Sequence, residues 1–262
     1  MNTRYALWLN NQGLHDLDER IIITDVQESA PRMRTVTAAN AHYDGQRVTR
    51  RTRQSLSLTV SFLIREYDTA RRKHLCSTVC AWANTGGWLT ISDRPGQRLR
   101  VCCETLPAVS SSLRWTEPLT ITFTAWEMPF WQDESPVRTF LSVSAGKAAS
   151  AVIRPHGDAP CTFLEGSFTN TGTANVSSLT IAAGSSVFHL NDPALIPPGA
   201  TLTIGYDDNL LLYIRTGDAS MLHARSADSS DDLTLTPGRP CAVSITGSQN
   251  LSVTLQARGL YL

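Results

Sequence analysis

The segment from Ser55 to Ile64 places a large apolar residue at every second position. The apolar residues are Leu56, Leu58, Val60, Phe62 and Ile64, and those between them are Ser or Thr apart from Leu63. A period of two over ten residues is typical of a β-strand with one buried face. The same alternation occurs at Leu99, Val101 and Cys103 and at Ile121, Phe123 and Ala125, and shorter strands are predicted at Tyr5–Leu9, Ile21–Val26 and Trp88–Ile91. The first half of the chain is therefore expected to be mainly β.

One segment of this half has a helical pattern, from about residue 68 to residue 84. Leu75, Val79 and Trp82 fall at positions i, i+4 and i+7, so they share one face of a helix, with Cys76, Cys80 and Ala83 beside them. Asp68 is suited to be the N-cap, because its carboxylate can accept hydrogen bonds from amides of the first turn. Gly86 and the glycine after it can adopt the left-handed conformation that ends a helix. We expect one amphipathic helix packed on a sheet.

The stretch from Ala30 to Gln54 is predicted to form a long hairpin that projects from the body of the domain. Its apolar residues are sparse, and an Asp44-Gly45 turn signal separates two polar, strand-compatible arms. A polar hairpin buries little apolar surface and is not stable in isolation. It therefore needs a neighbour to lie against.

The hairpin also concentrates basic residues, with Asp44 as the only residue of opposite charge. Arginine clusters can bind phosphates or form subunit contacts. The whole chain has 23 Lys and Arg against 23 Asp and Glu, so no global basic field favours nucleic acid. We therefore predict a subunit interface, and expect no sequence-specific nucleic-acid binding. The candidate interface residues are Arg32, Arg34, Tyr43, Arg47, Arg50, Arg51 and Arg53.

The composition changes after residue 135. The remainder is poor in charge and contains short alternating segments separated by Pro-Gly and Asn-Thr-Gly turns, which indicates a β-sandwich or jelly roll. A chain of 262 residues corresponds to roughly 1.7 domains at ~150 residues each. We predict a domain at 1–135 and a second at 136–262.

No local motif for catalysis, nucleotide binding or a metal site occurs in the sequence, so we expect neither an enzyme nor a cofactor. The N-terminus lacks the apolar core of a secretory signal and no apolar run approaches 18 residues, so no membrane insertion is expected. The six cysteines are expected to be reduced, small buried hydrophobes. Zinc binding by Cys76, Cys80, Cys102 and Cys103 is disfavoured, because no CxxC pair is present and adjacent strand residues face opposite ways.

Two further clusters have a functional and a structural interpretation. The acidic runs Asp207-Asp208-Asn209 and Asp228 to Asp232 could ligate Ca²⁺, but such residues more often cap turns. The aromatic cluster of Trp126, Phe130 and Trp131 could stack on a ligand, but we predict that it packs at the domain junction. We therefore expect no metal or cofactor.

Several of these segments, taken in order, resemble the distal tail proteins of long-tailed siphophages. An Arg-rich polar hairpin runs into SLSLTVSFLI, and the helix DTARRKHLCSTVCAWANTGG leads into WLTISDRPGQRLRVCC with its Pro-containing turn. The domain closes with LTITFTAWEMPFWQD, where Glu-Met-Pro-Phe departs slightly from the commoner Asp-Pro-Phe turn of the family. The remainder, from RPHGDAPC to RGLYL, looks like the sandwich that follows in that family.

The resemblance implies a fold and a structural role. The fold would be an N-terminal β-sandwich or split-barrel-like domain with one helix and the hairpin, followed by a galectin- or carbohydrate-module-like sandwich. Six copies would form a ring at the virion tail tip, assembled in the host cytoplasm, with the hairpin as a belt around the neighbouring subunit. The ring would join the tail tube to the tail-associated hub or spike protein and to receptor-binding components. The alternatives are carbohydrate binding, as an adhesion module of the baseplate or a stand-alone protein, and a hydrolase without a recognisable motif.

Overall fold

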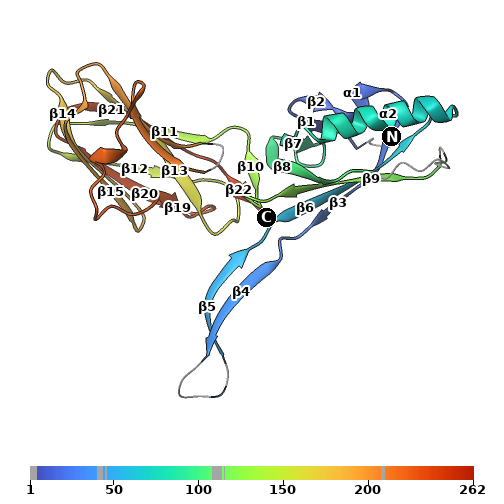
Figure 1. The fold of residues 1–262 in the computed structure, drawn as a ribbon. Coiled ribbons are helices and arrows are strands. Elements are labelled where there is room, and N and C mark those ends of the chain that lie inside the picture. The colour runs from blue at the N-terminus through green and yellow to red at the C-terminus, as the bar shows by residue number, and fades with distance from the viewer. Residues whose placement is uncertain (1–4, 40–43, 45, 108–113, 115, 208–209) are drawn as a thin grey trace. The chain divides into compact units, whose positions relative to one another are not determined.

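The computed structural model describes residues 5–39, 44, 46–107, 114, 116–207 and 210–262. They form two compact units, residues 1–131 with Leu262 (unit 1) and residues 132–261 (unit 2). Both are built mainly from antiparallel β-strands (Figure 1). The sequence placed the boundary four residues later and assigned Leu262 to the second domain. The predicted mainly-β class is confirmed.

Unit 1 is a sheet with the strand order β2-β1-β7-β8-β9-β6-β3, covered on one face by helix α2 (Figure 1). The strands are β1 (Leu7–Leu9), β2 (Gln12–Gly13), β3 (Ile21–Ser29), β6 (Leu56–Ile64), β7 (Gly87–Ile91), β8 (Gln97–Thr105) and β9 (Leu119–Ala125). The helices are α1 (Leu14–Leu17) and α2 (Thr69–Ala83). Strands β4 (Met33–Ala39) and β5 (Gln46–Arg53) form a separate two-stranded ribbon.

Strand β6 lies between β3 and β9 and supplies much of the core of unit 1. Its five alternating apolar residues are at most 2% exposed, as the period of two predicted. Helix α2 covers this face: Trp82 meets Phe123 of β9 edge to face, with ring centroids 6.0 Å apart. The indole of Trp82 also donates a 3.0 Å hydrogen bond to the carbonyl of Gln12. These contacts join three segments that are far apart in the sequence.

The buried face of α2 differs from the predicted one at two positions. Cys76, Val79 and Trp82 are buried, but Leu75 is only half-buried. Arg72, one turn earlier, is 5% exposed, and its guanidinium donates to the carbonyls of Glu66 and Tyr67. A charged side chain can be buried in this way when backbone carbonyls satisfy its donors.

Helix α1 is the second difference, because the sequence predicted a single helix. It has only four residues, too few for a helical period to be visible. The Asp16 carboxylate accepts a 3.1 Å hydrogen bond from the Gly13 amide and so supports the first turn. The predicted limits of α2 are confirmed: Asp68 caps its start, and Gly86 and Gly87 have positive φ just beyond its end.

Asp68 makes the stability of unit 1 depend on pH. The Arg71 amide, 2.9 Å from the Asp68 carboxylate, is the main cause that lowers the pKa of this group below its ordinary value. A lowered folded-state pKa stabilises the fold above the unfolded pKa of about 4, and this contribution is lost as the pH falls through the folded value.

We therefore expect the urea midpoint of Asp68→Asn to change less between pH 7 and pH 3 than that of the unaltered chain. Asn still accepts the capping hydrogen bond, so its midpoint at pH 7 stays above that of Asp68→Ala. Circular dichroism measures both midpoints. An equal loss on acidification in all three proteins would contradict the assignment.

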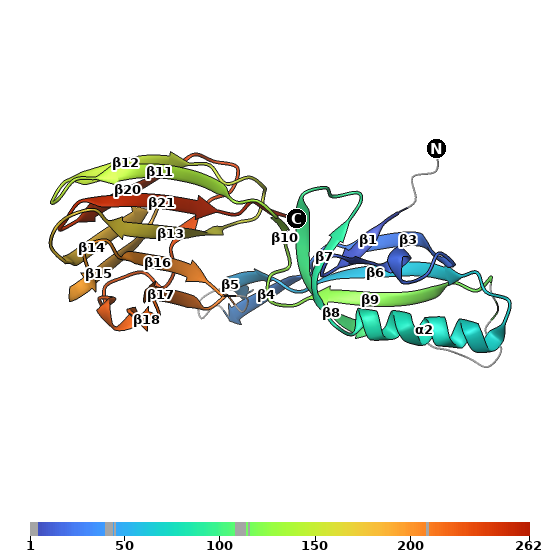
Figure 2. The ribbon, with the colours of Figure 1, turned by 90° about the horizontal axis from the view of Figure 1, so that it is seen from above.

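Unit 2 is a β-sandwich, as predicted. One sheet has the order β11-β21-β13-β16-β17-β18 with β19 paired to β13, and the other has the order β12-β20-β14-β15 (Figure 2). The first contains β11 (Val137–Val143), β13 (Thr162–Asn170), β16 (Thr201–Tyr206), β17 (Leu212–Thr216), β18 (Ala219–Ser220), β19 (Thr234–Leu235) and β21 (Leu251–Ala257). The second contains β12 (Ala148–Ile153), β14 (Val176–Ala183), β15 (Ser186–Ile196) and β20 (Cys241–Gly247).

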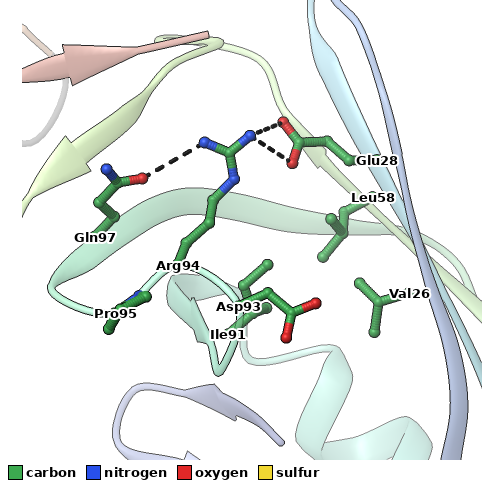
Figure 3. A pocket seen from close by; sticks show the side chains of 8 residues that line it. All are labelled: Val26, Glu28, Leu58, Ile91, Asp93, Arg94, Pro95 and Gln97. Carbon is green, nitrogen blue, oxygen red and sulfur yellow. Dashed lines mark hydrogen bonds and ion pairs between the residues drawn. The ribbon is translucent and has the colours of Figure 1, made fainter. Parts of the chain in front are cut away.

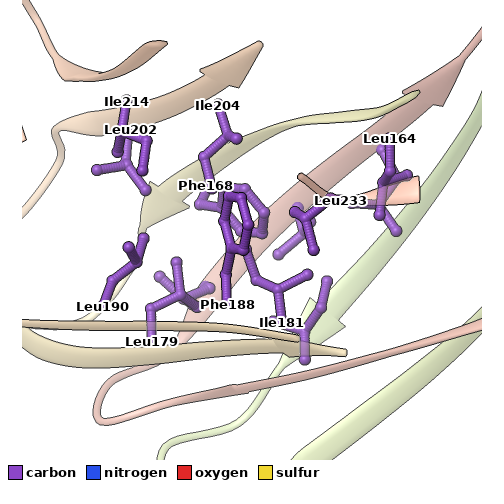
Figure 4. Packing of buried hydrophobic residues seen from close by; sticks show 14 of the residues in the cluster. Leu164, Phe168, Leu179, Ile181, Phe188, Leu190, Leu202, Ile204, Ile214 and Leu233 are labelled. Carbon is purple, nitrogen blue, oxygen red and sulfur yellow. The ribbon is translucent and has the colours of Figure 1, made fainter. Parts of the chain in front are cut away.

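The core of unit 2 lies between these two sheets. Phe168 of β13 and Phe188 of β15 meet at its centre, surrounded by aliphatic side chains from both sheets (Figure 4). A 3₁₀ turn, η1 (Leu222–Ala224), follows β18. Strand β10 (Trp131–Asp133) spans the unit boundary and pairs with β22 (Leu260–Tyr261).

Candidate subunit interface on the projecting hairpin

Strands β4 and β5 form the hairpin expected from residues 30–54. Figure 1 shows the two strands as a ribbon that extends away from the sheet of unit 1. Every residue of β4 is exposed, and so are the first six residues of β5. The exposed residues include Met33, Val36 and Val48, which are 53%, 41% and 48% exposed. Such a ribbon has no core of its own. Tyr43, one of the candidate residues, lies outside the described residues. Of the Asp-Gly turn, only Asp44 is described.

A β-bulge at Thr49 decides which arginines lie together. Val36 pairs with Arg50 and Thr37 pairs with Val48, so one extra residue stands in β5. Thr49 donates a 3.0 Å hydrogen bond from its hydroxyl to the Val36 carbonyl. In a regular strand, residues three apart lie on opposite faces, so Arg47 and Arg50 would point in opposite directions. The extra residue of the bulge places both on the same face.

The predicted arginine cluster is therefore divided between the two faces of the ribbon. The register puts Arg34, Arg47 and Arg50 on one face, together with Val36 and Ala38. It puts Arg51 and Arg53 on the other face. Within the described part of the chain, Arg34, Arg47, Arg50 and Arg51 form no ion pair, so their charges are available to a partner.

Two of the candidate residues belong to the root of the hairpin rather than to its free part. Arg53 is half-buried, with its guanidinium 5.4 Å from the ring centroid of Phe130. The carbonyl of Arg32 accepts a 2.8 Å hydrogen bond from the Gln54 amide and so closes the base of the ribbon. The hairpin root thus has internal contacts, whereas Arg47, Arg50 and Arg51 lie beyond it.

A charged network fixes the strand that leads into the hairpin. Arg94 lies 3.1 Å from the carboxylate of Glu28 at the end of β3, and it also contacts Gln97 (Figure 3). Its guanidinium donates a further hydrogen bond to the Leu262 carbonyl. Trp131 is fully buried, donates a 3.0 Å hydrogen bond to Glu28, and packs under the Arg94 guanidinium at 5.1 Å. These contacts hold the hairpin root in a defined position.

The sequence does not predict this network. The Asp93-Arg94-Pro95-Gly96 segment indicates a turn but names no partner for Arg94. Glu28 is 66 residues from Arg94 and 103 residues from Trp131 along the chain. No local pattern connects residues at such separations.

The three aromatic residues that were expected to pack at the domain junction differ in their burial and contacts. Trp131 is buried and Phe130 lies under Arg53, but Trp126 is 62% exposed. Trp126 lines a hollow of about 660 Å³ at the hairpin root, together with Arg32, Arg34 and Glu104. Trp126 is therefore less buried than Trp131, and its packing at the domain junction stays a prediction.

No arrangement for metal chemistry is present among the described residues, where no three His, Cys, Asp or Glu side chains gather closely enough to hold an ion. All six cysteines are free thiols. Burial, together with the neighbouring Cys80, raises the pKa of Cys76 to about 12, so Cys76 is a poor nucleophile. Cys102 and Cys161 are exposed, contrary to the expectation that all six are buried.

The acidic runs in unit 2 have local partners. In the second run, the pKa of Asp228 is lowered chiefly by a side-chain hydrogen bond from Ser226. In the first run, the Asp207 carboxylate accepts a 2.9 Å hydrogen bond from the Leu211 amide, and residues 208 and 209 lie outside the described residues. In the regions covered by the structure, no helix is long and apolar enough to span a membrane.

Comparisons with known proteins bear on the fold. No protein-family model matches the sequence, and no curated protein matches it. Among solved structures, this chain is similar to the Dit (gp 19.1) protein of phage SPP1. The match covers 98% of this chain and 99% of the SPP1 protein, with a TM-score of 0.73 and 13% sequence identity. That protein is described as a paradigm of the hub adsorption apparatus in phages that infect Gram-positive bacteria.

A second match is the baseplate of phage P2 in its activated conformation with Ca. It covers 98% of this chain and 97% of that chain, with a TM-score of 0.50 and 7% identity. The fold expected from the order of the sequence motifs is confirmed. The chain has the fold of the phage SPP1 Dit protein through both of its units.

Proposed function

We propose that the chain is a structural subunit of a phage tail baseplate, which joins copies of itself into a ring through its hairpin. The fold shared with the SPP1 Dit hub protein supports the baseplate assignment. The observation that carries the self-association is the ribbon β4–β5, with its exposed strands and its unpaired arginines. The proposed role is structural, and we propose no enzymatic activity.

The physical argument concerns the stability of the ribbon. A two-stranded hairpin in water is marginal by itself, since its cross-strand hydrogen bonds replace bonds to water and it buries little apolar surface. Arginine is favoured at protein interfaces because its planar guanidinium makes several directed hydrogen bonds. A neighbouring copy would supply the apolar contacts and carboxylates that the hairpin lacks.

A hairpin that leaves one copy and binds a different surface of the next makes a head-to-tail contact. Such a contact closes into a ring when the rotation per subunit divides the full circle. In our proposal the ring has six copies and sits at the virion tail tip, assembled in the host cytoplasm. One face would meet the tail tube, and the other would meet the hub or spike protein and receptor-binding components.

The mass of the purified protein tests this proposal. Six copies of the 28.7 kDa chain weigh about 172 kDa. We expect this species by light scattering coupled to gel filtration, and six-fold rings by negative-stain electron microscopy. A particle of 28.7 kDa at every concentration, also in the presence of the tail tube and hub proteins, would refute the proposal.

Carbohydrate binding by unit 2 is the second candidate, and one observation favours it. The rings of Phe163 and Tyr206 lie 4.2 Å apart on the sheet that contains β13 and β16, next to a Glu165–Gln256 hydrogen bond of 2.6 Å. Aromatic faces beside polar groups are what sugar rings bind. Saturable binding of the full chain on a glycan array, lost in Phe163→Ala, would favour this candidate.

A further inference from the structure

One hollow in unit 1 has the chemistry to receive an arginine and an apolar side chain together. It has a volume of about 570 Å³ and lies between strand β3 and the β7–β8 turn (Figure 3). Its apolar wall comes from Leu58, Ile91, Val26 and Pro95, and its polar groups are Glu28, Asp93, Arg94 and Gln97. This volume is much larger than one side chain.

The charges in this hollow are not equally available. Figure 3 shows the Arg94 guanidinium turned toward Glu28 and Gln97, whereas the Asp93 carboxylate points the other way, toward Val26. Asp93 is exposed, and its contact within the described residues is a 3.3 Å hydrogen bond from the Ser92 hydroxyl. Among the described residues, the Asp93 carboxylate forms no ion pair, so the hollow combines an apolar wall with one available anion.

The hairpin carries the complementary pair. Val36 and Arg50 are directly opposite each other across the β4–β5 ladder, so they share one face and stand side by side. Ala38 and Arg47 form the next pair on that face. An aliphatic side chain can bind the apolar wall, while the neighbouring guanidinium reaches a carboxylate with its own stem along apolar surface.

On both faces of the ribbon, the root residues lie against unit 1 itself. Met33 and Arg53 line a hollow with Arg94 and Leu262, and Arg34 and Thr52 line the hollow that contains Trp126. The Val36–Arg50 pair lies further along the ribbon. The ribbon is also long enough to reach another molecule, because seven residues of β4 extend about 23 Å at 3.3 Å per residue.

From these observations we propose that the Asp93 hollow of one copy receives the Val36–Arg50 pair of a neighbouring copy's hairpin. This inference rests on the proposed self-association and names the surface that the hairpin binds. The binding partner in this proposal is a second copy of this chain. Charge complementarity argues for it: in the part of the chain that the structure describes, the hairpin offers cations and the hollow an anion that form no ion pair.

A charge reversal tests the pairing. We expect Asp93→Arg and Arg50→Asp each to weaken assembly at least about tenfold, since each places like charges opposite each other. The double variant Asp93→Arg/Arg50→Asp re-forms the ion pair with its ends exchanged, and we expect it to assemble within about threefold of the unaltered chain. Sedimentation velocity across a concentration series measures all three.

Two matched controls separate local charge from net charge. Glu19→Arg changes an exposed carboxylate elsewhere in unit 1, and Lys73→Glu changes an exposed cation on helix α2, away from the ribbon. Both are expected to assemble normally. A far-UV spectrum confirms that each variant is folded, and Arg50→Asp probes the pair from the exposed hairpin if Asp93→Arg does not fold.

The outcomes distinguish this inference from the proposed function. Normal assembly of Asp93→Arg or of Arg50→Asp, or failure of the double variant to recover, would overturn the pairing. If a chain without the hairpin still assembles, the proposed function itself fails. A third outcome is that the chain without the hairpin fails to assemble while Asp93→Arg assembles normally. This result would support the proposed function and refute the Asp93 hollow as the surface that the hairpin binds.

Discussion

A chain lacking residues 33–52 is expected to fold normally and to remain a monomer. The deleted residues form β4 and most of β5, which bury none of the unit 1 core. Ser29 at the end of β3 and Ser57 in β6 are paired in register, so the residues left between them can close a short turn. All contacts that carry the core of unit 1 are retained.

The reason for the loss of assembly is that the free arginines and the exposed apolar residues of the ribbon are removed together. We expect gel filtration with light scattering to report only the mass of one chain, and circular dichroism to report an unchanged β-rich spectrum. A matched control retains the ribbon and replaces only Thr35 and Thr37 with Ser, which should assemble as the unaltered chain does. Rings formed by the deletion variant would show that other surfaces carry the self-association.

Replacing Val79 with Asp is expected to unfold unit 1. Val79 is fully buried on the face of α2 that packs on the sheet, next to Trp82. The substitution removes an apolar side chain and places a carboxylate where it has neither water nor a positive partner. Effects of this kind cost about 4 kcal/mol or more, a large part of the stability of an ordinary domain.

Chemical denaturation followed by circular dichroism measures this loss. Ser77→Asp is the matched control, because Ser77 is exposed on the same helix, and its midpoint should hardly change. Leu75→Asp should be milder than Val79→Asp, since Leu75 is half-buried. Unit 2 has its own core and is expected to keep its unfolding transition in all three variants. Equal midpoints for Val79→Asp and Ser77→Asp would contradict the packing described for α2.

The elements that were predictable are those with local signals. The alternation of β6 is a property of nine consecutive residues, and burial of one face follows wherever such a strand joins a sheet. The start of α2 at Asp68 and its end before Gly86 depend on backbone groups within a few residues. Helix α1 has no such signal, because one turn is too short to show a period.

The candidate interface was only partly predictable for the same reason. The polar, arginine-rich composition of residues 30–54 indicated a hairpin that needs a partner, and the structure has this ribbon. Composition does not reveal a bulge, so the assignment of Arg47 and Arg50 to one face required the register between the two strands. The burial of Arg72 depends likewise on carbonyls that only the folded turn before α2 brings within reach.

By itself, the sequence determined the strands, the main helix and the polar hairpin, because each follows from the spacing of apolar residues, glycines and capping groups along a short stretch of chain. Only the tertiary structure decided where the arginines face, which carboxylates are neutralised and which stay free. Arg94 pairs with Glu28, whereas Asp93, beside an apolar wall, forms no ion pair within the described part of the chain. Such choices depend on contacts between distant residues, whose geometry exists only after the sheet has formed.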